Sequence, residues 1–156
     1  MFYDKNQNPI PPPSNQNEPQ VIDLLQDYLN SNNKTGYLVF QVHQDSPIYG
    51  RLPIANAKIT LCKLLGNGFY VCKVIMTDVD GKTEPVPVPT VSAEFSRSPE
   101  NVITNAAYDV SVEAPGFVKS EVLNIPVFEG ITSIQNVILT PVVQQVRREN
   151  FNGNGN

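Results

Sequence analysis

The chain contains a single histidine, His43, which limits the acid–base chemistry that its side chains can perform. A hydrolytic triad needs a nucleophile, a base and an acid that orients the base, and the base is usually histidine. The alternation of apolar and polar residues places His43 on the outward side of a strand, so we expect a surface histidine. Two cysteines are too few for a four-ligand zinc site. The sequence therefore predicts a protein that is not an enzyme and binds neither a metal nor a cofactor.

Three acidic residues lie close to Gly81, namely Asp78, Asp80 and Glu84. Their oxygens could bind a hard cation, but an EF-hand loop needs a longer run of ligands that ends in a bidentate Glu. This segment turns back after Gly81. We expect a glycine-containing turn between two strands, with a weak surface calcium site as the alternative.

Cys62 and Cys72 lie on either side of a turn signal, Gly66-Asn67-Gly68. A three-residue loop there would place the two cysteines opposite each other across a hairpin. A bond between them would need some strain, and no secretion signal is visible, so we expect free thiols. On an oxidising surface the same thiols could instead cross-link two subunits.

Charge and hydropathy exclude two classes of partner. The 156 residues include 15 acidic and 11 basic ones, so the chain has a net charge of −4 and no basic excess to neutralise nucleic acid phosphates. Its longest apolar runs are only a few residues, which excludes a transmembrane helix and a membrane partner. The first residues show no apolar signal-peptide core. We expect synthesis in the cytoplasm, with a spore surface, a cell surface or an assembled particle as the final location.

The pattern along the chain divides it into four parts. Residues 1–20 form a proline-rich extended arm, and residues 21–35 form a short amphipathic helix and a linker. Residues 36–141 alternate with a period of two, and residues 142–156 form a polar tail. Turn signals divide the alternating part into about seven short strands. The fold class is therefore all-β, a β-sandwich with an N-terminal arm and helix.

The inward-facing residues of the predicted strands form three series. We expect the core to contain Leu38, Phe40 and Val42 from the first series, Ala57, Ile59 and Leu61 from the second, and Tyr108, Val110 and Val112 from the third.

The arm and the helix contain the residues that we expect to bind a partner. Prolines keep the arm extended and lower the entropy that it loses on docking, so it could add to the edge strand of a neighbouring molecule. The apolar residues that could contact a partner are Phe2, Tyr3 and Ile10 in the arm and Val21, Ile22, Leu25 and Leu29 in the helix. A spacer role for the arm, and packing of the helix on its own sandwich, are the alternatives.

Four segments of the alternating part stand in a recognisable order, namely Gly36–Val42, Pro53–Leu61, Thr77–Gly81 and Tyr108–Phe117. In this order they resemble the carboxypeptidase regulatory-like, or transthyretin-like, domain. The closing segment, Val127–Pro141, is similar to a bacterial branch from spore-forming anaerobes. There such domains are the non-catalytic part that accompanies cell-wall and spore-cortex-lytic enzymes. The resemblance implies a seven-stranded Greek-key β-sandwich of the transthyretin-like, or prealbumin-like, type.

Two functions fit these observations. The first is a structural or interaction protein that self-associates as a homo-oligomer, or attaches to a cell-envelope, spore or virion-like assembly. The alternative is an accessory module that binds peptidoglycan or another glycan beside a separate hydrolase. Glycan sites usually present exposed aromatic rings, and the chain has no Trp. The remaining candidates are Tyr37, Tyr49, Phe69 and Tyr70.

Overall fold

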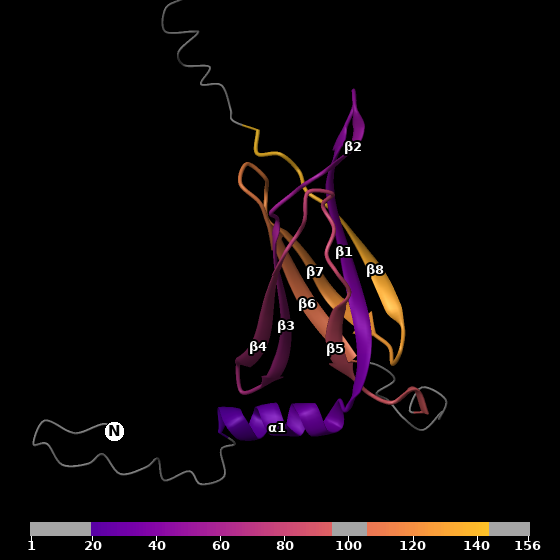
Figure 1. Ribbon diagram of the computed structural model, residues 1–156. Helices are drawn as coiled ribbons and strands as arrows, with labels where there is room; N and C mark the ends of the chain where they lie inside the picture. Colours follow the sequence, from indigo (N-terminus) through magenta and orange to yellow (C-terminus); the bar gives the residue numbers. More distant parts are fainter. Residues whose placement is uncertain (1–19, 95–105, 144–156) are drawn as a thin grey trace, which may run out of the picture.

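Two β-sheets packed face to face, with a helix across one end, make up the part of the chain that the computed structural model describes, residues 20–94 and 106–143 (Figure 1). The protein is an all-β sandwich with one short helix. In chain order the elements are α1 (Val21–Ser31), β1 (Lys34–Ser46), β2 (Gly50–Pro53), β3 (Lys58–Gly66), β4 (Phe69–Met76), β5 (Val86–Thr90), β6 (Ala106–Glu113), β7 (Ser120–Val127) and β8 (Thr132–Ile138).

The first sheet is built around β1, which has neighbours on both sides. One side of β1 pairs with β8 in parallel. The other side pairs with β5 near the start of β1 and with β2 near its end, both antiparallel. The second sheet has the order β4-β3-β6-β7, and all its pairs are antiparallel. β1 is therefore the central strand that positions the rest of its sheet.

The alternation in the sequence correctly predicted the core. Side chains from the two inner faces form one buried apolar cluster, because every second residue of a strand points to the same face. All nine residues of the three predicted inward series belong to this cluster: Leu38, Phe40, Val42, Ala57, Ile59, Leu61, Tyr108, Val110 and Val112.

The strand count differs from the prediction. We expected about seven strands, and the described residues contain eight. The short strand β2 has four residues and no apolar alternation, so its sequence carries no strand signal. It forms because β1 extends as far as Ser46 and turns back on itself, which pairs Ser46 with Gly50.

The β3–β4 hairpin forms at the predicted turn signal, but its loop has two residues where we expected three. Asn67 and Gly68 both have positive φ, at 51° and 78°, which is the pattern of a two-residue type I′ turn. A register shift between Leu64 and Gly66 accommodates the extra residue, Leu65, in β3.

The predicted arm residues Phe2, Tyr3 and Ile10 lie outside the described residues.

The helix that the structure describes does not have the length and apolar character needed to cross a membrane.

Candidate functional site

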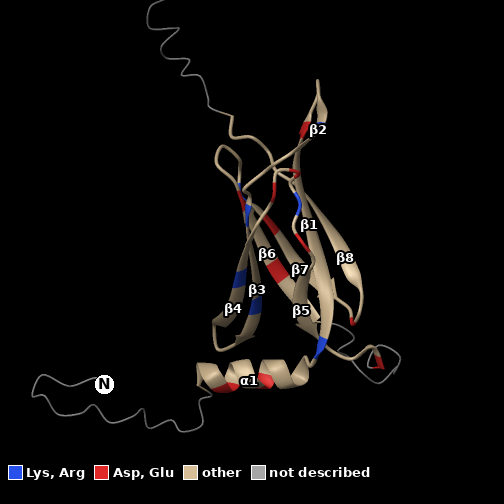
Figure 2. Ribbon diagram, in the orientation of Figure 1, with Lys and Arg blue, Asp and Glu red and all other residues tan. Residues whose placement is uncertain are grey.

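The outer edge of β8 is open in the described part of the chain. β8 pairs with β1 over seven residue pairs, from Tyr37–Thr132 to His43–Ile138, and no described strand pairs with its other side. It has no charged residue and no proline, and Figure 2 draws it in tan, the colour of residues other than Lys, Arg, Asp and Glu. An edge strand of this kind presents free backbone groups to another chain.

The backbone hydrogen bonds show which groups of β8 are free. The N–H of Tyr37 donates to Ile131 O, and the N–H of Leu139 donates to His43 O. The backbone N–H and C=O groups of the odd-numbered residues in this segment therefore bond to β1. The backbone groups of the even-numbered residues point away from β1. The N–H and C=O groups that face outward belong to Thr132, Ile134, Asn136 and Ile138.

The other sheet edges carry features that discourage pairing. β4 has Lys73 at an inward-facing position opposite the buried Leu61. β5 contains two prolines in five residues. β7 contains Pro126 and a register shift near Asn124, whose φ is +58°. Inward charges, prolines and bulges are the usual protections of an edge strand. Among the described strands, β8 is the long edge without such protection.

A second candidate region is the junction between α1 and the sandwich. Tyr28 of α1 and Tyr108 of β6 share a hydrogen bond between their hydroxyl groups, and the hydroxyl of Tyr108 donates to Pro89 O in β5. Tyr28 must then be the donor to Tyr108. Burial raises the pKa of Tyr108 above its usual range. Burial also raises the pKa of Tyr28. This chain of hydroxyls ties the helix to both sheets.

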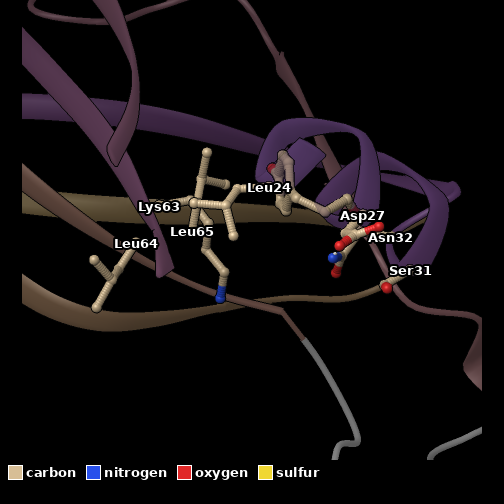
Figure 3. Close-up of a pocket in the computed structure, with 8 residues that line it drawn as sticks. Leu24, Asp27, Ser31, Asn32, Lys63, Leu64 and Leu65 are labelled. Atoms are coloured by element: carbon tan, nitrogen blue, oxygen red, sulfur yellow. Dashed lines mark hydrogen bonds between the residues drawn. The ribbon is translucent and has the colours of Figure 1, made fainter. Parts of the chain in front are cut away.

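A cavity of about 280 Å³ between α1 and β3 has Tyr28 in its lining (Figure 3). Leu24 and Asp27 of α1 and Lys63 and Leu65 of β3 also line it. The Lys63 ammonium donates to Ala107 O at 2.9 Å and lies 5.6 Å from the centre of the Tyr108 ring. Burial lowers the pKa of Lys63, while the charge of Asp109 acts in the opposite direction. Lys63 is therefore already partnered by this backbone carbonyl and this ring.

A smaller cavity, of about 190 Å³, also has Tyr28 in its lining. It is lined mainly by apolar side chains from α1, the second sheet and β5, among them Leu25, Leu61, Val71 and Val88. Together the two cavities show that α1 covers the end of the sandwich without filling it. No residue of α1 is fully buried.

The helix residues that we predicted to bind a partner fall into two groups, those that face the protein's own sandwich and those that are exposed. Leu25 is partly buried and faces the protein's own sandwich beside Tyr28. Leu29 also lines the cavity, although it is half exposed. Val21 and Ile22 are exposed and remain available for a partner. The alternative that the helix packs on its own sandwich therefore holds for one face of α1.

The prediction that Cys62 and Cys72 are free thiols is wrong, because the structure joins them in a disulfide. The two residues are direct partners in the β3–β4 register, as the turn predicted, and their Cα atoms are 4.2 Å apart. That spacing is close to the roughly 4.5 Å of a non-hydrogen-bonded antiparallel pair, in which side chains lie nearest to each other. The described part of the chain holds no free cysteine.

His43 points outward as predicted, but the expectation of a surface histidine is wrong. Only 3% of His43 is exposed. Its strand neighbours across the sheet are Pro53 on one side and Ile138 on the other, because β1 is central. These two neighbours cover the outward-facing His43, and the sequence alone did not show that β1 is central.

The acidic residues near Gly81 form a closed turn. The carboxylate of Asp78 accepts the backbone N–H groups of Asp80 and Lys82 at 2.9 and 3.0 Å. The N–H of Gly81 donates to the backbone O of Asp78. Within residues 20–94 and 106–143, no three His, Cys, Asp or Glu side chains are grouped as a metal site would need.

Lys63 and Tyr28 are site residues that sequence reasoning missed. Lys63 continues the inward series of Ile59 and Leu61. A lysine at an inward position is unusual, and this could have marked Lys63 as a site residue in the sequence. Tyr28 lies on the apolar face of the helix, but nothing in its sequence context indicated that it would meet Tyr108.

Comparisons with known proteins give little similarity. No protein-family model and no curated protein matches the chain. One similar solved structure is that of a candidate carbohydrate-binding protein from Bacteroides uniformis, with 16% sequence identity and a TM-score of 0.36. The match covers 67% of this chain and 41% of that chain. A match at this level supplies no argument about function.

Proposed function

We propose that the chain is a non-catalytic structural and interaction module that self-associates, and that the arm of one copy adds to the free edge of β8 in a neighbouring copy. An assembly of this kind suits a cell envelope, a spore surface or a virion-like particle. We also propose that residues 36–141 are a transthyretin-like domain of the carboxypeptidase regulatory-like type with Greek-key connections.

The observation that supports this proposal is the open edge of β8. The seven residues of β8 include no charge and no proline, and four of them present outward N–H and C=O groups, while the other described edges are short or protected. Ile134 and Ile138 are 57% and 51% exposed on the same strand, so an added strand could also bury apolar surface. β8 is thus suited to pair with a further strand.

The arm supplies a segment of matching length. Met1–Asn8 is free of proline and has eight residues, and the prolines begin at Pro9. Backbone pairing needs N–H groups, which proline lacks, so we assign the pairing to Met1–Asn8. Phe2 and Tyr3 provide apolar contacts that a spacer would not need. The prolines that follow keep the connection to the sandwich extended.

The contact is head-to-tail, since the arm and β8 are different parts of the chain. Such contacts give a ring when the rotation between copies closes and a filament when it does not. Self-association should therefore depend on both the arm and β8.

The test compares molar mass in solution for four forms of the chain. We expect the full chain to form a concentration-dependent oligomer, and both the deletion of Met1–Pro13 and Ile134→Lys to be monomeric. Val74→Lys is the matched control, because Val74 is 56% exposed on the other sheet and Ile134 is 57% exposed. A full chain that stays monomeric at high concentration and in the native extract, or equal effects of both lysines, would contradict the proposal.

Peptidoglycan binding is the second candidate, and a cavity beside His43 with polar and charged residues in its lining is the observation in its favour. The exposed aromatic residues do not support it equally. Tyr37 lies on β1 and Tyr49 in the β1–β2 turn, whereas Phe69 and Tyr70 lie in the β3–β4 hairpin of the other sheet. They do not share one face of one sheet, as a glycan platform would need. Co-sedimentation with insoluble cell wall separates this candidate from self-association.

A further inference from the structure

A cavity of about 300 Å³ lies on the outer side of β1, where β2 and the turn at Gly81 approach it. The polar and charged residues in its lining are Gln41, His43, Arg51, Asp80 and Lys82. Charged residues of both signs gather around this end of β1 in Figure 2. The cavity is separate from the α1 junction.

His43 lies in the wall of this cavity with an unsatisfied nitrogen. The Nε2 atom has no hydrogen-bond partner in the described part of the protein, although the residue is 97% buried. The nearest acid is Asp45, whose Oδ1 lies 3.6 Å away, beyond hydrogen-bond distance. A buried polar atom without a partner is unfavourable and points to a functional role or to a missing partner.

The charges of the lining favour an anion. Arg51 and Lys82 are cationic and Asp80 is anionic, which leaves an excess of one positive charge in a chain whose net charge is −4. Arg51 is the strand partner of Asp45, yet neither Arg51 nor Lys82 forms an ion pair with a described residue. Asp45 is 61% exposed, so solvent screens its charge. Within the described residues, the two exposed cations beside the cavity therefore have no ion-pair partner.

The backbone around the cavity is held in place before any ligand arrives. The N–H of Val42 donates to Gly81 O at 2.7 Å, and the N–H of Ile54 donates to Val42 O at 3.0 Å. The Asp78 carboxylate fixes the N–H groups of Asp80 and Lys82. A binding site gains affinity when its groups are positioned in advance, because less conformational entropy is lost on binding.

We propose that this cavity binds a small hydroxylated anion, either a sugar acid or a sugar phosphate. Arg51 and Lys82 bind the carboxylate or phosphate, since guanidinium and ammonium groups pair with both. Gln41 and Asp80 accept hydrogen bonds from the hydroxyl groups. This inference is independent of self-association, because none of these residues is in the arm or in β8.

The test uses His43 as a reporter, since the only histidine of the chain gives one set of imidazole NMR signals. The full chain is titrated with glucuronate, with glucose 6-phosphate and with neutral glucose. We expect a saturable shift of the His43 signals with at least one of the two anions, and at least about tenfold weaker binding of glucose. Glucuronate alone identifies a carboxylate ligand, and glucose 6-phosphate alone identifies a phosphate.

Matched variants assign the binding to the cavity. Arg51→Gln and Lys82→Gln should each weaken anion binding about tenfold or more, as expected for a lost charge-assisted hydrogen bond. Lys58→Gln removes an exposed lysine from the other sheet and should leave the affinity unchanged. Unshifted His43 signals with both anions, equal binding of glucose, or equal effects of all three variants would overturn the proposal. Molar mass, measured in parallel, distinguishes this failure from a failure of self-association.

Discussion

Gly81, like Gly36, is a glycine at which the described fold leaves no room for a side chain. Its φ is +73°, and an added Cβ would lie 2.4 Å from the backbone O of Val42 and 3.0 Å from the backbone N of Ile54. The same backbone atoms bring β1, β2 and the turn together. Gly81 therefore determines how closely these segments approach.

We expect Gly81→Ala to lower the free energy of unfolding by about 2–5 kcal/mol. About 1–2 kcal/mol comes from the left-handed backbone and about 1–3 kcal/mol from the steric overlap. Gly116→Ala is the control, because Gly116 has a φ of +83° but no atom within 4 Å of the added Cβ. It should lose about 1–2 kcal/mol. Urea denaturation measures both, and equal losses would show that the close approach has no energetic effect.

The alternation of residues predicted which side chains point inward, but it did not predict the burial of outward ones. Leu38, Phe40 and Val42 were correctly placed because a strand has a period of two whatever its neighbours are. His43 was misjudged because its cover comes from β2 and β8, which are distant or weakly marked in the sequence. The positions of Arg51 and Lys82 beside His43 follow from the same sheet order. They too could not be predicted from the sequence alone.

At the scale of elements, the β3–β4 hairpin is closed by both a turn and a covalent bond. Its sequence predicted the pairing of Cys62 with Cys72, and the register confirms it. The oxidation state was mispredicted, because the missing secretion signal was given more weight than the geometry of the pair. Opposed cysteines in a non-hydrogen-bonded pair are already within bonding reach.

We expect the double substitution Cys62→Ser and Cys72→Ser to lower the free energy of unfolding by about 3 kcal/mol. The disulfide closes a short loop, with a sequence separation of 10, and a link of that length restricts the unfolded chain by about this amount. Urea denaturation with and without reductant measures the effect. Reductant should destabilise the natural chain and leave the double variant unchanged. Two titratable thiols in the native, unreduced protein would contradict the disulfide.

Whether β8 is an open edge could not be read from its own residues. Thr132–Ile138 shows weak alternation, and a strand with this sequence could lie in the middle of a sheet. Its edge position follows from the crossover that sets it parallel to β1. The arm was recognised from composition alone, but the strand that it could join became visible only in the sheet order.

For the whole molecule, the central question is whether the sandwich needs α1 for folding. The core cluster contains no fully buried residue from the helix, and Tyr28 is only packed against its margin. We expect the fragment 36–141 to unfold in one cooperative transition, with a free energy of unfolding about 2–4 kcal/mol lower than that of the full chain. The loss comes from Leu24, Leu25 and Tyr28, which are half buried in the junction.

Calorimetry of the fragment and of a longer fragment, 20–143, tests this prediction. The longer fragment retains α1 and should be as stable as the full chain at concentrations too low for self-association. A broad transition of fragment 36–141, without a defined unfolding enthalpy, would mean that the helix belongs to the cooperative core.

The parallel pairing of β1 and β8 has a mechanical consequence. Tension applied at the start of β1 and at the end of β8 draws these two strands along their axes in opposite directions. Their hydrogen bonds, spread over seven residue pairs, lie across the direction of pull and are loaded together instead of opening one after another. Since β1 is also the central strand of its sheet, the sandwich resists stretching through its flanking segments in the geometry of a shear clamp.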